Sequence, residues 1–253
     1  GMINENLSRI TLDNWLPKDY YQDPKAALGV FGGNYKYAVL MNLMIQAFRY
    51  AAEPFFFAQS SEKNSPQLFA RVNHYFVIAC SLVLLGVSIN MDILKFFLGQ
   101  KEYWEGVHIV PILLLAYLFL GIYYNYSVWF KLTDKTYFGT AITFAGLVVT
   151  IAGNYFLIPV LGYTGSSIAA LLCYFVMMML CYWFGQKFFP IPYTIGKDFL
   201  YIIMTTVIVY VVYQIDPGID SQVLRTGFHL LVICIFVTIV FFLERKGWRQ
   251  GQA

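Results

Sequence analysis

The stretch that decides the fold runs from residue 34 to residue 57 and reads NYKYAVLMNLMIQAFRYAAEPFFF. It is mostly apolar, and as an α-helix it is long enough to cross ~30 Å of hydrocarbon, for which about 20 residues suffice. Four polar side chains interrupt it: Asn42, Gln46, Arg49 and Glu53. At about 100° of rotation per residue, these positions fall within an arc of about 60°. The stretch therefore predicts a transmembrane helix with one polar stripe.

Arg49 and Glu53 carry opposite charges at a spacing of four residues. Side chains so spaced meet on one face of a helix, so we expect an ion pair. Ionisable groups at membrane depth are costly and often mark a functional site.

Two interpretations of the stripe remain open. In the first, it lines a water-filled cavity in which Arg49 attracts an anionic group and Glu53 tunes the charge. Asn42 and Gln46 would offer hydrogen bonds there, and Tyr35, on the same arc, would extend the lining. In the second, the same side chains only join this helix to its neighbours, as polar groups also do in bilayers.

Composition agrees with a membrane protein. Of the 253 residues, 59% are hydrophobic and 12% are charged, whereas soluble domains are about 25% charged. A membrane-spanning chain must satisfy its own backbone hydrogen bonds, and without period-2 alternation it does so with helices. The fold class predicted is an all-α polytopic bundle of about seven complete spans.

The expected spans follow the apolar runs, each close to the ~20 residues that cross a bilayer. They lie at about 34–58, 72–94, 108–130, 138–160, 166–185, 198–215 and 226–243. Only residues 159–165 connect the fourth span to the fifth, which predicts an antiparallel hairpin.

Loop charges indicate the orientation if the spans alternate in direction. One side of the membrane would carry Lys63, Arg71, Lys131, Lys135, Lys187, Lys197, Arg245, Lys246 and Arg249. The other side would carry Lys18, Lys25, Lys95, Lys101 and Arg225. The positive-inside bias favours a cytoplasmic carboxyl terminus.

The remaining polar and sulfur-containing positions carry weaker signals. Three histidines stand at or near span ends and are expected to be solvated: His74, His108 and His229. Asp92 closes the second span and is expected to be exposed, whereas Asn125 and Asn154 either face a cavity or bond a neighbouring helix. The cysteines lie inside apolar runs and are expected to be buried small hydrophobes: Cys80, Cys173, Cys181 and Cys234.

The tyrosines at the end of the third span, Tyr123, Tyr124 and Tyr126, either stack on sugar rings or lie in the interfacial aromatic belt. The sequence contains no phosphate-binding glycine loop, nucleophile elbow or paired-aspartate metal motif. We therefore expect no enzyme activity, no catalytic residue, no metal and no cofactor.

A family resemblance rests on two segments, GVFGGNYKYAVLMNLMIQAFRYAAEPFFF at residues 29–57 and GMINENLSRITLDNWLP at residues 1–17. Together they resemble the bacterial polysaccharide-biosynthesis transporters, the oligosaccharide flippases of the multidrug/oligosaccharidyl-lipid/polysaccharide exporter superfamily. The match is specific at residues 46–57, QAFRYAAEPFFF. Gly-Met-Ile-Asn-Glu at residues 1–5 also fits, but Ser8-Arg9 keeps the arginine of a family Asp-Arg pair and lacks its acid.

The resemblance implies a transporter of two six-helix lobes with two extra helices, fourteen in all, of which this chain is the C-terminal half. Residues 1–27 would be the end of a truncated helix and a connector. Residues 28–189 would be the C-terminal lobe, and residues 190–253 two additional transmembrane helices with a basic tail. Related flippases hold the substrate diphosphate with cationic side chains, some on the eighth helix, where Arg49 stands.

The implied function is the flipping of a polyprenyl-diphosphate-linked oligosaccharide across the bacterial inner membrane for polysaccharide or lipopolysaccharide assembly. The implied partners are this lipid-linked oligosaccharide, membrane lipids, the missing N-terminal lobe, polysaccharide polymerase and glycosyltransferases, with no nucleic acid. The alternatives are an ion-coupled multidrug exporter of the same superfamily and an integral membrane glycan ligase or acyltransferase. The connections between spans look too short for the catalytic loop that such an enzyme would need.

Overall fold

A computed structural model describes the backbone of residues 10–17 and 24–250. The structure is 89% helical and has no strand in these two ranges, which confirms the all-α class. The elements are α2 (Pro24–Gln59), α3 (Ser65–Ile89), α4 (Met91–Leu94), η1 (Lys95–Leu98), η2 (Lys101–Ile109), α5 (Val110–Tyr126), α6 (Val128–Leu132), α7 (Tyr137–Leu161), α8 (Tyr163–Phe188), α9 (Ile195–Ile215), η3 (Asp216–Gly218) and α10 (Gln222–Gln250).

Six helical segments in the described chain are long and apolar enough to cross a membrane. They are Ser65–Ile89, Lys101–Leu132, Tyr137–Leu161, Tyr163–Phe188, Ile195–Gly218 and Gln222–Arg245. The chain is therefore a multi-pass membrane protein. The seventh expected span, α2, is long enough with 36 residues, but its polar stripe and Lys36 make it less apolar than the other six.

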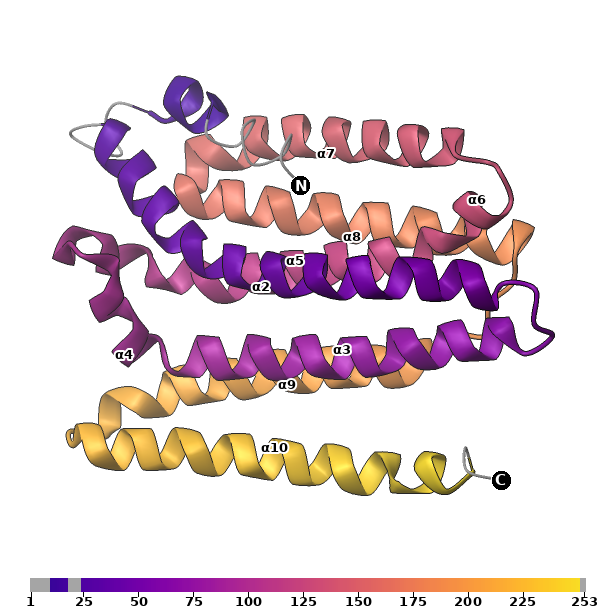
Figure 1. The fold of residues 1–253 in the computed structure, drawn as a ribbon. Coiled ribbons are helices and arrows are strands. Elements are labelled where there is room, and N and C mark those ends of the chain that lie inside the picture. Colours follow the sequence, from indigo (N-terminus) through magenta and orange to yellow (C-terminus); the bar gives the residue numbers. More distant parts are fainter. Residues whose placement is uncertain (1–9, 18–23, 251–253) are drawn as a thin grey trace.

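The long helices lie side by side and alternate in direction (Figure 1). In this view α7 and α8 lie at the top, α2 passes in front of α5, α3 passes in front of α9, and α10 lies at the bottom. The connections after α2, α6 and α8 and the end of α10 meet at one end of the bundle, which we call the carboxyl-terminal end. The turns after α3, α7 and α9 meet at the opposite end.

The centre of the bundle is α5. In the span that contains α5, 72% of the most apolar 18-residue stretch is buried inside the protein. In the span formed by α10 the corresponding share is 11%. Buried residues cover all sides of α5, among them Leu113, Leu114, Tyr117 and Leu118. A helix that is apolar all round belongs in the interior of a protein or in lipid, and α5 and α10 illustrate these two cases.

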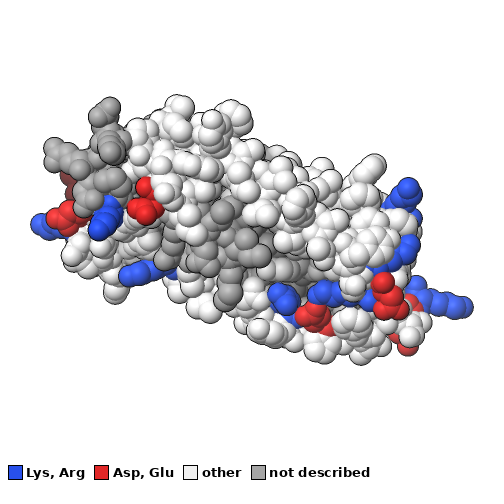
Figure 2. Space-filling view, turned by 90° about the horizontal axis from the view of Figure 1, so that it is seen from above, with Lys and Arg blue, Asp and Glu red and all other residues white. Residues whose placement is uncertain are grey.

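The distribution of charge is also that of a membrane protein. On the face drawn in Figure 2, the Lys, Arg, Asp and Glu side chains gather towards the two ends of the elongated molecule, and a largely uncharged band lies between them. Charged groups are expensive in hydrocarbon and stable in water and headgroups, so the uncharged band is the part that fits the bilayer core.

The hairpin predicted at residues 159–165 is confirmed and is tighter than expected, because only Gly162 separates α7 from α8. Gly162 has φ +57°, a conformation that glycine adopts without steric cost. At Gly165, a Cβ atom would lie 2.4 Å from the Leu157 carbonyl oxygen of α7. The absence of a side chain at residue 165 therefore allows the two backbones to touch.

Helix boundaries differ from the predicted spans mainly at their starts. The helix α2 begins at Pro24 rather than near residue 34, and α3 begins at Ser65 rather than near residue 72. Hydropathy marks the part of a helix that lies in hydrocarbon, whereas backbone hydrogen bonding continues into polar turns beyond it. Much of the segment between the second and third predicted spans forms two short 3-10 helices, Lys95–Leu98 and Lys101–Ile109.

Candidate functional site

The polar stripe of α2 forms a row of contacts along the helix. Gln46 Nε2 donates to Asn42 Oδ1 at 3.3 Å, and Arg49 Nη1 donates to Gln46 Oε1 at 3.4 Å. Arg49 Nε lies 3.6 Å from Glu53 Oε2, so the predicted ion pair is confirmed. Each of these side chains is neighbour to the next at a spacing of three or four residues, as the helical repeat requires.

A third charged residue, Lys131 of α6, completes the site. Its Nζ forms an ion pair with Glu53 Oε1. We call Arg49, Glu53 and Lys131 the cation cluster, because two positive groups share one carboxylate. Their side chains are 34%, 27% and 26% exposed, respectively. The cluster therefore presents a partly exposed net positive charge, which is suited to binding an anion.

Arg49 also contacts an aromatic ring. The Arg49 guanidinium lies 4.8 Å from the centre of the Tyr124 ring on α5, within the range of a cation–π interaction. The cavity lined by the cation cluster, Tyr124 and Asn125 measures only about 10 Å³, about enough for one water molecule. A ligand larger than water therefore does not fit inside this cavity unless side chains move, although the three charged groups are partly exposed on its outer side.

Tyr35 does not join this row. Its side chain is 4% exposed, and its hydroxyl group forms a hydrogen bond with the hydroxyl of Tyr117 on α5. Tyr35 does lie on the same side of α2 as the other four residues, as the helical repeat predicts. However, the half of α2 that carries Tyr35 packs into the core.

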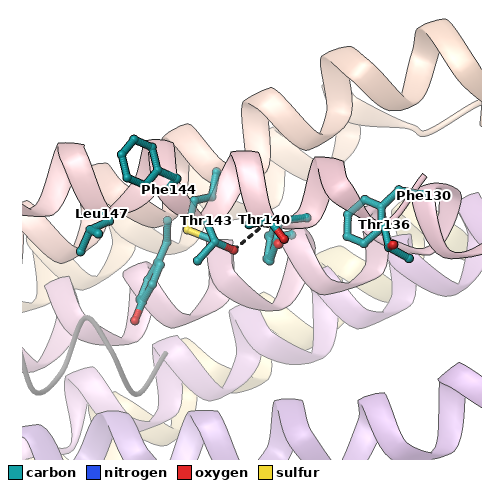
Figure 3. Close-up of a pocket in the computed structure, with 10 residues that line it drawn as sticks. Phe130, Thr136, Thr140, Thr143, Phe144 and Leu147 are labelled. Carbon is teal, nitrogen blue, oxygen red and sulfur yellow. Dashed lines mark hydrogen bonds between the residues drawn. The ribbon is translucent and has the colours of Figure 1, made fainter. Parts of the chain in front are cut away.

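A larger pocket lies next to the cation cluster, between α5, α7 and α8. Its volume is about 550 Å³, within the range of small-molecule sites. It is lined by Tyr123, Phe130, Thr136, Gly139, Thr140, Thr143, Phe144, Leu147, Tyr174 and Met177. In Figure 3, Thr140 and Thr143 follow one another along α7 and Thr136 lies just before its start, with Phe130 near Thr136 at one end and Phe144 and Leu147 towards the other. We call it the threonine pocket.

Two neighbouring tyrosines of α5 connect this pocket to the cation cluster. Tyr123 lines the threonine pocket, and Tyr124 lies beneath Arg49. The centres of their rings are 5.6 Å apart. An anion-attracting group therefore stands beside a pocket of hydroxyl groups and aromatic rings.

A second polar site was not predicted. His74 of α3 is buried between two carboxylates: Nδ1 contacts Asp198 Oδ1 of α9, and Nε2 lies 3.2 Å from Glu244 Oε2 of α10. The three side chains are only 6%, 4% and 5% exposed, respectively. The expectation that His74 is solvated is wrong, because tertiary packing supplies the carboxylates that its own helix lacks.

Further hydrogen bonds connect this histidine site to the cation cluster. Asn73 donates to Asp198 Oδ2 at 3.1 Å, and Asn125 of α5 donates to Asn73 Oδ1 at 3.2 Å. Asn125 also lines the small cavity of Arg49 and Glu53. Polar groups thus continue from α2 across α5 and α3 to α9 and α10. Asn154 likewise bonds a neighbouring segment, donating to Thr11 at 2.9 Å.

The expectations for the other histidines and for Asp92 have mixed outcomes. His108 is exposed as predicted. His229 is fully buried, and its Nε2 lies 2.9 Å from Asp216 Oδ1. The Asp92 side chain is 11% exposed rather than open to solvent, and its Oδ1 lies 3.9 Å from His229 Nδ1. Both errors have one cause, since α10 covers the end of α3.

Three cysteines, Cys80, Cys173 and Cys181, are buried as predicted. Cys234 is exposed, because it lies on the outer helix α10. An apolar environment in the sequence does not distinguish a residue in the protein core from one that faces lipid.

The residues at 1–5 and 8–9 on which part of the family resemblance rests lie outside the described ranges. Comparison of the chain with protein-family models, with curated proteins and with solved structures finds no match. Any functional conclusion therefore depends on the geometry of the sites.

Proposed function

We propose that this chain is the C-terminal half of a transporter that flips a polyprenyl-diphosphate-linked oligosaccharide across the bacterial inner membrane. The product would serve surface polysaccharide or lipopolysaccharide assembly. The observation that carries the proposal is the cation cluster, in which Arg49 and Lys131 share the single carboxylate of Glu53 on a partly exposed face of a membrane bundle.

The chemistry of the cluster fits a diphosphate. A guanidinium group binds phosphate oxygens through two parallel N–H donors, and an ammonium group adds a mobile point charge. An incoming diphosphate would compete with Glu53 for both cations. Such competition allows the cluster to stay closed between transport cycles and to open only on a strongly anionic ligand.

The surroundings of the cluster fit the rest of the substrate. The tyrosine rings and threonine hydroxyls of the threonine pocket are groups that contact sugar rings by stacking and hydrogen bonding. Asn42 and Gln46 extend the row of donors and acceptors along α2. The polyprenyl tail would stay in lipid while the two lobes alternate access to the hydrated cavity. The carboxyl terminus would then lie in the cytoplasm.

A second candidate is the ion-coupled multidrug exporter, and the buried His74 site favours it. A buried imidazole between two carboxylates is a group of residues that ion-coupled transporters use to bind protons. Export of cationic dyes by the complete protein, with no effect on glycan export, would select this function. A radiolabelled glycan or acyl transfer assay would test the remaining alternative, a membrane ligase or acyltransferase.

Complementation tests the flippase proposal. Cells that lack their flippase would receive the complete protein with Arg49→Ala, with Arg49→Lys or with Lys36→Ala as the matched control. Lys36 is an exposed cation on the same helix, outside the stripe. We expect surface glycan to be lost with Arg49→Ala, reduced with Arg49→Lys and unchanged with Lys36→Ala, at equal amounts of protein in the membrane. Normal export by Arg49→Ala would refute the proposed role of Arg49.

A further inference from the structure

A separate pocket lies at the end of the bundle opposite the carboxyl-terminal end. It measures about 300 Å³ and lies where α3 and α9 end and α10 begins. Its lining is Ile89, Met91, Asp92, Lys95, Trp104, Val107, Tyr213, Asp216, Pro217 and Arg225. Because spans end at this level, the pocket belongs to the interface between hydrocarbon and water, where aromatic residues such as Trp104 are enriched.

The pocket carries charges of both signs that are not paired with each other. Asp92 and Asp216 supply two carboxylates, and Lys95 and Arg225 supply two cations. Among the residues that the structure describes, both carboxylates lie close to His229 instead: Asp216 Oδ1 is 2.9 Å from Nε2 and Asp92 Oδ1 is 3.9 Å from Nδ1. Lys95 Nζ instead lies over the Trp104 ring at 5.0 Å, and Arg225 Nη2 donates to the Ile219 carbonyl at 2.6 Å.

Several of these side chains form a hydrogen bond through one polar atom while another of their buried polar atoms has no hydrogen-bond partner. Asp92 Oδ2 accepts a hydrogen bond from Gln222 at 2.8 Å, whereas its buried Oδ1 has no hydrogen-bond partner in the described part of the chain. The same holds for Arg225 Nε and for Nδ1 of the fully buried His229, which lies 3.9 Å from Asp92 Oδ1, too far for a hydrogen bond. A buried polar atom without a partner is destabilising, because it has given up its hydrogen bonds to water. Native proteins rarely keep several of them together without a ligand or water to satisfy them.

We propose that this pocket binds the headgroup of a zwitterionic aminophospholipid, of the phosphatidylethanolamine class. Arg225 and Lys95 bind the phosphate, and Asp92 and Asp216 accept hydrogen bonds from the primary ammonium. A group that carries one negative and one positive charge matches a pocket that carries both signs without pairing them.

Other headgroups match less well. A phosphate without an amine would leave Asp92 Oδ1 without a donor and would be repelled by the carboxylates of Asp92 and Asp216. A quaternary ammonium has the right charge, but it has no N–H to donate to a carboxylate, whereas a primary ammonium has three. The pocket should therefore distinguish ethanolamine from choline headgroups through hydrogen bonding and not through charge.

The position of the site gives the bound lipid a structural role. Asp92 follows α3, Asp216 follows α9, and Arg225 belongs to α10. A headgroup held by these residues would connect the outer helix α10 to the rest of the bundle at this end. This inference requires a membrane-spanning bundle and does not depend on the flippase proposal.

Native mass spectrometry of the full chain tests the site, with the detergent-purified protein exposed to equal mixtures of phosphatidylethanolamine, phosphatidylcholine and phosphatidylglycerol. We expect the ethanolamine lipid to be retained about tenfold over each of the others, the factor expected for one hydrogen bond to a charged group. Arg225→Gln and Asp92→Asn should each remove this preference. Lys101→Gln should keep it, because Lys101 is exposed at the same end of the bundle and does not line the pocket.

Three outcomes would overturn the proposal. Equal retention of ethanolamine and choline lipids by the wild-type chain would do so without any variant, so a folding defect cannot obscure the test. An unchanged preference in both pocket variants would place the lipid elsewhere. Displacement of the lipid by free phosphoethanolamine at equal concentration would assign the pocket to a soluble ligand.

Discussion

Lys131 of α6 and Glu53 of α2 form an ion pair although 78 positions separate them in the sequence. Glu53 also pairs with Arg49, so one carboxylate holds two cations. The arrangement turns an apparently neutral Arg49–Glu53 pair into a site with a net positive charge. The proposed binding of a diphosphate depends on this surplus.

Removal of the shared carboxylate should destabilise the protein more than removal of either cation. Glu53→Gln leaves Arg49 and Lys131 as neighbouring unpaired cations, and we expect a loss of roughly 1 kcal/mol, since the partly exposed groups remain screened by solvent. Lys131→Gln should cost less, because Glu53 keeps Arg49. For a chain of this size, 1 kcal/mol lowers the Tm by about 2–4 °C. Thermal unfolding in detergent measures both variants, and a larger effect of Lys131→Gln would contradict the shared-carboxylate arrangement.

The buried histidine site should contribute more to stability than the cation cluster. His74→Ala leaves Asp198 and Glu244 buried without the imidazole, and breaking a buried charge pair typically costs about 3–5 kcal/mol. His108→Ala is the matched control, since His108 is exposed. We expect a large fall in the Tm for the first variant and little change for the second. Similar Tm values for the two would show that His74 is not held as described.

The α7–α8 hairpin should not tolerate a side chain at residue 165. In Gly165→Ala the new Cβ would lie 2.4 Å from a backbone oxygen of Leu157, and overpacking of this kind costs about 1–3 kcal/mol. Gly86→Ala serves as control, because no atom lies within 4 Å of a Cβ at that position and alanine favours a helix. Thermal unfolding should show a lower Tm for Gly165→Ala alone. Equal Tm values would mean that the two helices are not in contact there.

The orientation can be measured by labelling engineered cysteines. In a Cys234→Ser background, Lys101→Cys at one end of the bundle should react with a membrane-impermeant maleimide in intact cells. Ser61→Cys, an exposed position at the carboxyl-terminal end, should react only after permeabilisation. The opposite pattern would place the carboxyl terminus outside the cytoplasm.

The helical repeat within single segments was enough to predict part of this structure. It placed Asn42, Gln46, Arg49 and Glu53 on one face, and these residues do contact one another in that order. The short link around Gly162 likewise predicted the hairpin. Both predictions succeeded because they depend on neighbours along the chain, whose geometry the α-helix fixes.

Contacts between helices could not be predicted from the sequence, for a physical reason. Nothing in one sequence states which face of α6 meets α2, so Lys131 appeared only as a loop cation. The site of His74, Asp198 and Glu244 combines three helices, and each residue by itself resembles a polar group at a span end. Asp198 and Glu244 stand at the edges of the predicted spans 198–215 and 226–243, where charged side chains are common, so no pattern in the sequence indicates that they pair with His74.

The central claim is that Arg49 in the cation cluster holds the diphosphate of a lipid-linked glycan during flipping. The most direct measurement is the initial rate at which the complete protein in proteoliposomes moves a fluorescent polyprenyl-diphosphate oligosaccharide between leaflets. We predict that Arg49→Ala lowers this rate at least about tenfold, the effect of losing one charge-assisted hydrogen bond in the transport step, while Lys36→Ala flips at the wild-type rate. An Arg49→Ala protein that is folded, reconstituted in equal amount and as fast as the wild type would contradict the claim.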